Sequence, residues 1–418
     1  MNRFIYLLFS CSLLLLSLSG CEDYMDVAHS QEKSAATLYS IDNVISRANY
    51  FYSVIFENTR AHTPKINSII PISTTRSCEE GMPVYYIVNY NNNAGFVVVG
   101  ANEISKPILA ISDESTLSLD DINEIEPLKT YMDIATTQSV GIDTLTQEPT
   151  TPLNISITPK LHPNVRKWGQ ASPFNSYTPL VNGQHTLVGC IPLATAMMMS
   201  YYEWPIEHKG RTLNWKSYKS NYSNDLFLLL AELGEPENLN VNYGLEGSST
   251  IYSYIHRTMK NYDYLSKYSY VDLVDINLNP TEECKSEIES ILPLLMSGWG
   301  YNRTTNEGGF GHAWVIDGLL HIPYDPNNKL NPNNSPDKYF FHCVWGWAGR
   351  ANGYYLFDGF ESIGGNRHSK DGGDKTYPGY EDTESPYVFN NWVWGYYGFK
   401  KKPIISGGVE HPVTPIFP

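Results

Sequence analysis

Cys190 begins a stretch, GCIPLATAMMMSYYEWP counted from Gly189, in which Pro192 follows the cysteine within one helical turn. Glycine permits a tight turn from a loop into a helix, and proline suits the first turn of a helix. At a helix N-terminus, the free backbone N–H groups and the helix dipole favour a thiolate, which lowers the pKa of the thiol. The spacing therefore predicts a nucleophilic thiol at the start of a helix.

A thiolate nucleophile also needs a base within reach, a group that orients the base, and donors for the oxyanion. Among the eleven histidines, His312 is the best candidate for the base. It follows a glycine-rich segment, 308–311, that we expect to be a mobile loop. It also leads a short apolar strand that we expect to end in the turn Asp317-Gly318. A histidine in this place can face a cleft, and the alternative is a structural histidine at a strand edge.

Two other histidines compete for this role. His185 lies in a loop too close in sequence to Cys190 to face it easily. His342 lies between Phe341 and Cys343 in a strand-like run, which favours a packed core position.

Gln170, in the loop WGQ ahead of Cys190, is a candidate oxyanion donor together with the backbone N–H of Cys190. Each such donor is typically worth about 2.7–4 kcal/mol of activation free energy. Trp345 and Trp347 stand on either side of a glycine in VWGWAG and could shield the histidine from water. The alternatives are a solvated glutamine and ordinary core or surface tryptophans.

The elements around these residues indicate an α+β domain. The residues after Cys190 are apolar on nearly all sides of the helix, so we expect the helix to be buried with its N-terminus at an interior cleft. Helical patterns come first along the chain and strand patterns follow, which is an α+β order. The helices are expected at 226–234 and 250–264, and the strands at 312–318, 338–347 and 354–360, with a closing strand pair in 387–402.

Upstream, the sequence predicts a smaller α+β unit and a linker. A Thr- and Pro-rich segment without periodicity, 139–154, is typical of an exposed linker where proteolysis concentrates. The unit before it is expected to contain helices at 41–55 and 122–138, strands at 83–90 and 95–101 joined by a hairpin turn at 91–94, and a third strand at 106–116.

The N-terminus resembles a bacterial lipoprotein signal. Residues 1–20 contain Arg3 and an apolar run that is too short to span a bilayer comfortably, and LSGC resembles a lipobox ending at Cys21. We expect Cys21 to be lipidated and residues 21–35 to form a polar tether. The alternative is an ordinary cleaved signal with a chance cysteine.

Charge and cysteine usage exclude some classes of protein. The 418 residues carry 29 basic and 44 acidic side chains, a net charge of −15, which argues against a nucleic-acid partner. No two cysteines of this chain are spaced as CxxC, so we expect no metal site and no cofactor. An exported chain could instead form two disulfides, which is the structural alternative for Cys190. Setting aside Cys11 and Cys21, the cysteines available for pairing are Cys78, Cys190, Cys284 and Cys343.

Four segments resemble the signature blocks of the streptopain family of papain-like cysteine peptidases, which are made as zymogens. They are WGQASPFN, GCIPLATAMMMSYYEWP, GHAWVIDG and HCVWGWAG followed by NGYYLFD. Residues 83–114 are similar to the inhibitory prosegment of that family. The resemblance implies a two-lobed peptidase domain over 155–418, with a helical lobe and an antiparallel sheet lobe. It also implies an inhibitory prosegment over 36–138 and an activation region in 139–154.

By position, the resemblance implies that Cys190 is the nucleophile, that His312 is the general base and acid, and that Gln170 donates to the oxyanion. Trp345 and Trp347 would then flank the histidine.

One position departs from the family pattern. The family tends to carry an asparagine immediately before the first of these tryptophans, where this chain has Val344. A valine cannot accept the imidazole N–H, so orientation of the base would fall to a backbone carbonyl, a water or another side chain.

We therefore expect a secreted, lipid-anchored cysteine endopeptidase that is made as a zymogen and cleaves protein or peptide substrates. Its own prosegment would be the intramolecular inhibitor. The chain would be held at the bacterial cell envelope, on the outer membrane or cell surface, and released after activation. Val344 favours one alternative, a weak or inactive relative that binds peptides in the same cleft. Another thiol acyl-transfer enzyme, such as a cell-wall peptide amidase or a bacteriocin-type leader peptidase, is a third possibility.

Overall fold

The fold is described from a computed structural model. The structure describes residues 37–356 except for 57–62, 74–81, 104, 138–158, 252, 267–269, 272–292, 303–306 and 323–337. Beyond Leu356 it describes only 367–368, 374–375, 387–389, 394–396, 399–401, 405–406 and 409–410. The predictions for residues 1–20, 21–35 and 139–154 lie outside the described residues, as do those for Cys11, Cys21, Cys78 and Cys284.

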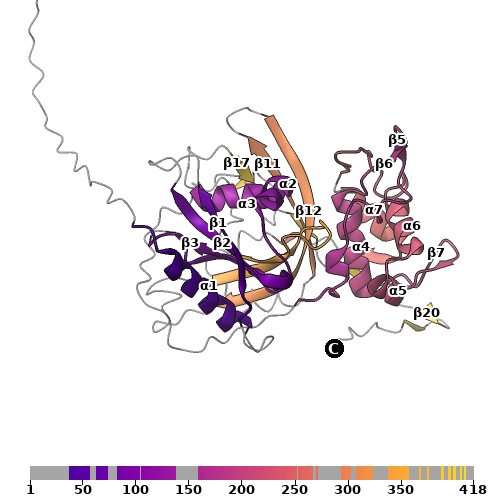
Figure 1. Ribbon diagram of the computed structural model, residues 1–418. Coiled ribbons are helices and arrows are strands. Elements are labelled where there is room, and N and C mark those ends of the chain that lie inside the picture. The colour runs from indigo at the N-terminus through magenta and orange to yellow at the C-terminus, as the bar shows by residue number, and fades with distance from the viewer. Residues whose placement is uncertain are drawn as a thin grey trace, which may run out of the picture. The chain divides into compact units, whose positions relative to one another are not determined.

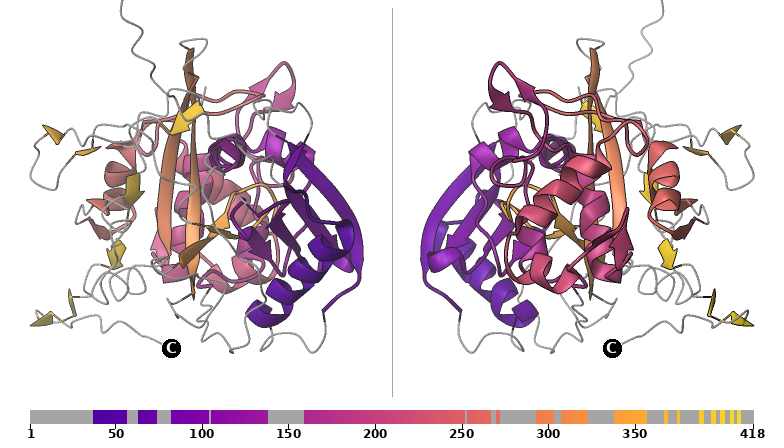
Figure 2. Two further views of the ribbon diagram at one scale, coloured as in Figure 1. Left: turned by 90° about the vertical axis from the view of Figure 1, so that its left-hand side faces the viewer. Right: turned by 90° about the vertical axis from the view of Figure 1, so that its right-hand side faces the viewer.

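The N-terminal region is the predicted α+β unit with one additional strand. It contains helix α1 (Ile41–Phe56), the strands β1 (Ile66–Ser73), β2 (Pro83–Tyr90), β3 (Phe96–Gly100) and β4 (Ile108–Ser112), and helices α2 (Leu119–Glu124) and α3 (Glu126–Thr137). In α1 the apolar side chains recur every three or four residues, so one face of the helix is buried against the strands (Figure 2). The turn between β2 and β3 is the predicted hairpin, with Asn92 in the left-handed region at φ 60°.

The predicted helix over 122–138 is two helices. Ser118 caps the first, with its side chain accepting from the backbone N–H of Asp121 while the Asp121 carboxylate accepts from the N–H of Ser118. This cap starts α2 earlier than predicted. Ile125 leaves the helical region, and Pro127 then suits the first turn of α3.

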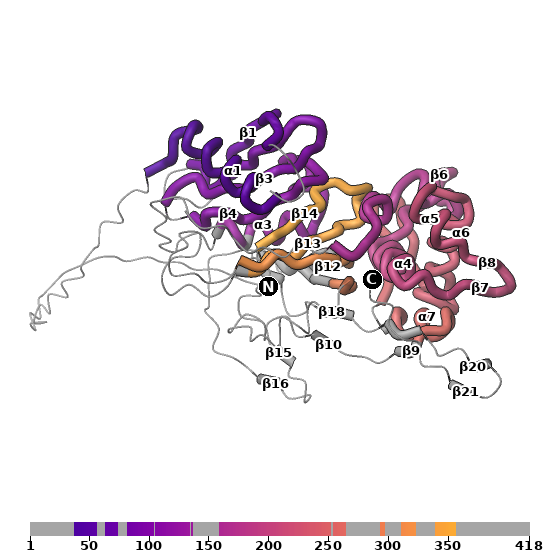
Figure 3. The backbone as a smooth tube through the Cα atoms, turned by 90° about the horizontal axis from the view of Figure 1, so that it is seen from below, coloured from indigo at the N-terminus to yellow at the C-terminus, as the bar shows by residue number. Residues whose placement is uncertain are grey.

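One antiparallel sheet connects the N-terminal region to the second half of the chain. The strand order is β1-β2-β3-β4-β14-β13-β12-β11-β18-β10, and β17 also pairs with β11. The later strands are β10 (Tyr270–Val271), β11 (Leu294–Asn302), β12 (Glu307–Ile322), β13 (Lys338–Val344), β14 (Gly353–Leu356), β17 (Tyr387–Phe389) and β18 (Trp394–Tyr396). The junction is the pair β4–β14 (Figure 3), and in this pair Ile111 is opposite Tyr354.

Two predictions for the segment around His312 were wrong. The glycine-rich segment 308–311 is not a loop, because β12 begins at Glu307 and its glycines pair with β11. The expected turn at Asp317-Gly318 is an irregularity inside the strand, which continues to Ile322. Glycine is needed at 318 for close approach: a Cβ there would lie 3.1 Å from the Cβ of His342 and 3.2 Å from the Cα of Pro159.

A helical lobe packs on the other face of this sheet. It contains α4 (Cys190–Tyr202), α5 (Trp215–Ser220), α6 (Asn224–Leu233) and α7 (Ser253–Asn261), together with the 3-10 turn η2 (Val165–Lys167), the short hairpins β5 (Leu180–Val181)–β6 (Gln184–His185) and β7 (Glu207–His208)–β8 (Arg211–Thr212), and β9 (Tyr264–Ser266), which pairs with β19 (Phe399–Lys401).

Strand β12 contributes to both cores, because successive side chains point to opposite faces of a strand. Ala313 and Val315 pack with the helices of the lobe, whereas Trp314 and Ile316 pack with the N-terminal region. Figure 1 shows β12 between α4 and the N-terminal helices and strands. The predicted α+β class with a helical lobe and an antiparallel sheet lobe is confirmed. Among the described residues, no helix combines the length and the apolar character that crossing a membrane requires.

Candidate active site

Cys190 is the first residue of α4, as predicted, and the helix behind it is buried from Ile191 to Ser200. Gly189 precedes it with φ +95°, a conformation that a side chain would strain, and a Cβ there would lie 3.3 Å from the Cβ of Ser248. The thiol therefore sits at the helix N-terminus on a turn that requires glycine. Cys190 is partly exposed, whereas the residues that follow it in the helix are buried.

Cys190 and His312 are hydrogen-bonded to each other. Burial acts to raise the pKa of the Cys190 thiol, but the charge and hydrogen bond of His312, with backbone hydrogen bonds at Ala313 and Ile191, outweigh burial and lower it. Burial likewise acts to lower the pKa of His312, and the Cys190 charge and hydrogen bond outweigh it and raise the imidazole pKa. The two shifts favour a thiolate–imidazolium pair.

The disulfide alternative does not apply to Cys190. Cys190 and Cys343 are both free cysteines, so they do not pair with each other. Cys343 is fully buried, and burial raises the pKa of its thiol well above the ordinary value. The two thiols of the described region therefore have opposite chemistry, one reactive and one inert.

His312 is oriented by a backbone carbonyl. Its Nε2 lies 3.1 Å from the carbonyl oxygen of Trp345, and the residue is 8% exposed. A carbonyl can only accept, so Nε2 carries the proton of this bond, which leaves Nδ1 for the thiol. This is the first of the three substitutes that the sequence left open for the missing asparagine at Val344.

The loop that carries Gln170 is held between the Cys190 turn and the tryptophan turn. The carbonyl of Gln170 accepts from the backbone N–H of Val188, 3.0 Å away, and the carbonyl of Trp168 accepts from that of Ala348, 3.1 Å away. Gly169 forms a β-bridge with Trp347. Gln170 is half-buried beside the segment that leads into Cys190.

Of the two tryptophans, only Trp345 has a contact with His312 among the described interactions. Trp345 contacts His312 through its main chain, while its indole is fully buried and donates from Nε1 to the carbonyl of Ala351 at 3.1 Å. Trp347 is partly buried against the same core. Of the competing bases, His185 lies on the exposed hairpin β5–β6 and contacts the carbonyl of Thr178 through Nδ1 at 2.8 Å.

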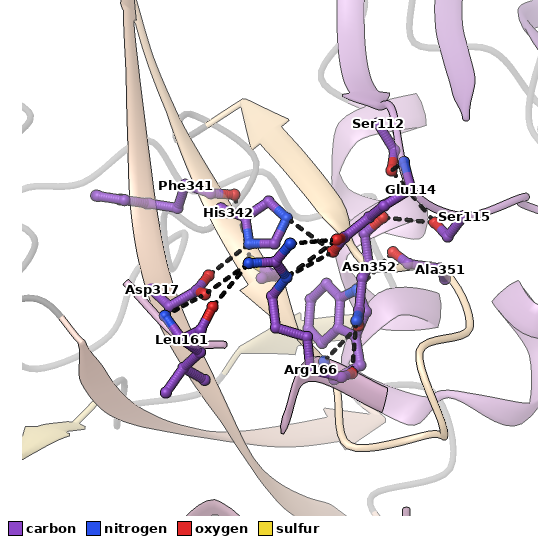
Figure 4. Close-up of polar contacts among 12 residues, drawn as sticks. Ser112, Glu114, Ser115, Leu161, Arg166, Asp317, Phe341, His342, Ala351 and Asn352 are labelled. Carbon is purple, nitrogen blue, oxygen red and sulfur yellow. Dashed lines mark hydrogen bonds and ion pairs between the residues drawn. The ribbon is translucent and has the colours of Figure 1, made fainter. Parts of the chain in front are cut away.

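His342 is buried, as predicted, but it is charged. Its Nδ1 lies 2.5 Å from Oδ1 of Asp317, and its Nε2 lies 3.2 Å from Oε1 of Glu114 (Figure 4). Burial acts to lower the pKa of His342, and the two carboxylates outweigh it and raise the pKa to about 9. Arg166 completes the cluster by donating from Nη2 to Glu114 at 2.6 Å.

This cluster, which we call the charged cluster (Glu114, Arg166, Asp317 and His342), was not predicted. Glu114 belongs to the N-terminal region, and the other three residues come from the region that follows it, Arg166 from η2, Asp317 from β12 and His342 from β13. Burial acts to raise the pKa of Glu114, but His342 and Arg166 outweigh it and lower the pKa to about 2. In the sequence these residues are scattered, and no local pattern relates them.

Across the described part of the chain, histidine, cysteine and carboxylate side chains form no group that could hold a metal ion. The site consists of a thiol, an imidazole and main-chain groups, which suits nucleophilic attack on a carbonyl.

Comparisons with known proteins agree with this chemistry. Residues 168–235 and 228–355 match the Peptidase C10 family, and residues 44–138 match the Spi protease inhibitor family. The chain is 25% identical over 324 residues to streptopain of Streptococcus pyogenes, an alignment that covers 65% of this chain and 73% of streptopain. It is 26% identical over 222 residues to the thiol protease/hemagglutinin PrtT of Porphyromonas gingivalis, covering 45% of this chain. That alignment spans 23% of the length of PrtT.

Among solved structures, a mutant prointerpain A fragment of Prevotella intermedia aligns with a TM-score of 0.45 at 21% identity, over 70% of this chain and 92% of that one. Active interpain A of the same organism aligns with a TM-score of 0.34 at 24% identity, over 48% of this chain and 87% of that one.

Proposed function

The chain belongs to the peptidase C10 family, the streptopain family of cysteine peptidases, with an inhibitor-like region ahead of the peptidase region, and on this premise we propose that Cys190 and His312 hydrolyse peptide bonds in protein substrates. The observation that carries the proposal is the hydrogen-bonded pair of thiol and imidazole at the N-terminus of α4, with the pKa of each shifted toward the charged form.

In the first half of the reaction, the Cys190 thiolate attacks the scissile carbonyl carbon and a C–S bond forms. The carbonyl π electrons move to the oxygen, which the backbone N–H of Cys190 and the side chain of Gln170 stabilise as an oxyanion. Collapse of this intermediate breaks the C–N bond, and His312 gives its Nδ1 proton to the leaving amine. An acyl thioester on Cys190 remains.

In the second half, neutral His312 takes a proton from a water molecule, which attacks the thioester carbonyl. The C–S bond then breaks, and Cys190 leaves as the thiolate, so the charged pair is restored. Throughout, the Trp345 carbonyl keeps the proton on Nε2 and directs Nδ1 toward the reacting atoms. Because this carbonyl orients His312, the valine at position 344 is no longer a reason to expect an inactive protein.

The inhibitor-like region is tied to the peptidase region by several buried contacts. Besides the β4–β14 pairing, the Tyr131 hydroxyl of α3 contacts the carbonyls of Leu109 at 3.1 Å and Leu356 at 3.0 Å, which joins α3, β4 and β14. Glu126, at the start of α3, lies close enough to His312 to act on its charge. These contacts support a zymogen in which the region over 36–138 covers the site.

Activation then requires a cut in the predicted linker, 139–154. Such a cut would separate the peptidase region from the N-terminal anchor as well as from the inhibitor-like region. We further propose that Cys21 is lipidated and holds the uncut chain at the bacterial envelope, a proposal that the LSGC motif supports. Incorporation of labelled palmitate into the wild type, and its loss in Cys21→Ala, would test it.

The test of the proposed activity uses the full chain and a thiol-directed epoxide inhibitor. Peptide mass analysis should place the adduct on Cys190 and leave buried Cys343 unmodified, which makes Cys343 an internal control. In a parallel sample without the inhibitor, the wild-type chain should shorten with time to the mass of its C-terminal part, and Cys190→Ser should not shorten. Equal labelling of Cys190 in a His312→Ala variant would contradict the proposal. Cleavage of cell-wall peptides but not of casein would favour the acyl-transfer alternative.

A further inference from the structure

The carbonyl that orients His312 lies where the sheet no longer fixes the main chain. The last residue of β13 is Val344, and β14 begins at Gly353, so Trp345 lies beyond the paired residues of both ladders. The turn between the two strands is irregular, and it places Gly346, Ala348, Gly349 and Ala351 at positive φ. Something other than strand pairing must therefore fix the direction of the Trp345 carbonyl.

Asn352 ties Trp345 to the rest of the fold. It is 1% exposed, and its Oδ1 accepts from the backbone N–H of Trp345 at 3.2 Å. Its Nδ2 donates to the carbonyl of Arg166 at 2.8 Å, which anchors the amide to the turn η2. The indole of Trp345 is held by the neighbouring carbonyl of Ala351. Residue 345 is thus held at its N–H and at its ring, and its carbonyl points in one direction.

We propose that Asn352 is a positioning residue for the reaction: it fixes the main chain of Trp345, whose carbonyl holds His312 in reach of Cys190. The inference rests on the proposed function of the Cys190–His312 pair. Residue 344 cannot supply this function, because Val344 is fully buried in the core of the helical lobe. An asparagine eight positions along the chain thus acts through the main chain.

The experiment compares three variants of the full chain with the wild type. Asn352→Ala removes both hydrogen bonds, and Asn352→Asp keeps the acceptor for the N–H of Trp345. Asn238→Ala is the matched control: Asn238 is also 1% exposed and also bridges two segments, through the carbonyl of Glu232 at 2.7 Å and the amide of Asn261 at 3.0 Å. Both of these hydrogen-bond partners lie in the helical lobe.

The readout is the rate of Cys190 alkylation by iodoacetamide as a function of pH, with the adduct located by peptide mass. This rate follows the thiolate fraction, which a merely structural residue would not change. In the wild type the midpoint should lie below the ordinary thiol value of about 8.5. Asn352→Ala should raise the midpoint by about one pH unit, which is a roughly tenfold slower reaction at pH values well below the wild-type midpoint. Glu126 is unchanged in every variant, so its effect on His312 is common to all.

Asn352→Asp should keep a midpoint close to that of the wild type. Asn238→Ala should lower the thermal midpoint of unfolding and leave the alkylation midpoint unchanged. The inference is overturned if Asn352→Ala titrates like the wild type, or if Asn238→Ala shifts the midpoint as much as Asn352→Ala does. If Asn352→Ala does not fold, the aspartate variant decides: a folded Asn352→Asp with an ordinary thiol midpoint contradicts the inference.

The experiment distinguishes a failure of the proposed Cys190–His312 pair from a failure of the inference about Asn352. A wild type whose Cys190 already titrates at the ordinary thiol value contradicts the proposed pair and the inference together. A wild type with a lowered midpoint that Asn352→Ala retains contradicts the inference alone.

Discussion

His312 and His342 lie in neighbouring strands of one sheet, both almost fully buried and both with a raised imidazole pKa, yet their surroundings differ. His342 lies between the carboxylates of Asp317 and Glu114, with Arg166 beside them. His312 lies between a thiol and a main-chain carbonyl.

The difference separates a structural charge from a reactive one. The carboxylate partners of His342 hold a negative charge over most of the pH range, so the imidazole of His342 keeps its proton. The negative partner of His312 exists only when Cys190 has lost its own proton, so that proton can move within the pair. Strongly shifted pKa values occur in both settings, and the chemistry of the partner decides which of them is a catalytic site.

The largest expected effect comes from exchanging the two histidines for alanine. His312→Ala should lower peptide hydrolysis by at least about 10²–10⁴-fold, the usual contribution of a general acid–base group, while the unfolding midpoint stays close to that of the wild type. His342→Ala should cost about 3–5 kcal/mol of unfolding free energy, because Asp317 would be left as a buried charge without this partner. Hydrolysis assays measure the loss of activity in His312→Ala, and denaturant titrations measure the loss of stability in His342→Ala. A His342→Ala variant as stable as the wild type would contradict the structural role of His342.

Removing the charge of Glu114 should loosen the inhibitor-like region. Glu114→Gln weakens the buried contacts to Arg166 and His342, and hydrogen bonds to charged groups are worth about 1.5–3 kcal/mol. We expect faster conversion of the full chain to its shorter form and a lower unfolding midpoint. The control is Glu124→Gln, because Glu124 is exposed and its 2.8 Å ion pair with Arg350 should be worth no more than about 1 kcal/mol. Equal effects of the two variants would contradict the role of the charged cluster.

Restoring the family asparagine should not improve the site. Val344→Asn places an amide in the apolar core of the helical lobe, which should cost about 1–3 kcal/mol of unfolding free energy. The activity per folded molecule should not rise, because the Trp345 carbonyl already occupies Nε2 of His312. Val344→Thr, which is nearly isosteric, is the control for shape. A rise in kcat for Val344→Asn would show that the carbonyl is an incomplete substitute.

The smallest expected effect is a pH dependence of the charged cluster. The pKa of Glu114 is lowered from 4.5 to about 2, so its contribution to stability is complete above pH 4.5 and is lost as the pH falls toward 2. The pKa of His342 is raised from 6.5 to about 9, so its contribution is complete below pH 6.5 and is lost as the pH rises through 9. One titrating group changes the unfolding free energy by at most about 1.4 kcal/mol per pH unit.

The inhibitor-like region should therefore be held most firmly between pH 4.5 and 6.5. Denaturant unfolding of the Cys190→Ser chain at a series of pH values would measure this without self-cleavage. Stability that keeps rising from pH 6.5 to 9 would contradict it.

Sequence patterns predicted what is local in this fold. The buried α4 helix, the α1 helix and the β2–β3 hairpin all follow from short-range periodicity and turn residues. Strand β1 was missed because INSIIPIS lacks clean alternation and contains Pro71. The glycine-rich start of β12 was interpreted as a loop, because glycine weakens a strand and only its pairing partner, β11, reveals the ladder.

At the site, side-chain chemistry predicted Cys190 and His312, which the fold brings together. Sequence analysis left a backbone carbonyl, a water and another side chain open as the orienting group. It could not select the Trp345 carbonyl, because a main-chain carbonyl is present at every residue and has no sequence signature. The charged cluster was equally hidden: Arg166 and Glu114 are 52 residues apart, and nothing local to either indicates the other. Such contacts exist only once the chain has folded.

The β4–β14 ladder has a consequence for how the chain acquires its structure. The N-terminal strands leave the ribosome first, and domains generally begin to fold in that order. Ser115 and its hydrogen-bond partner Asn352 are 237 residues apart, so this junction closes a very long loop, and such pairings form slowly. A preformed β4 gives the late-arriving β14 a ready edge on which to pair. A peptidase region that unfolded after losing β4 would have to rebuild its sheet with β14 as an unpaired edge strand, whose backbone groups are open to other chains. Once processed, the protein should therefore be far easier to keep folded than to refold.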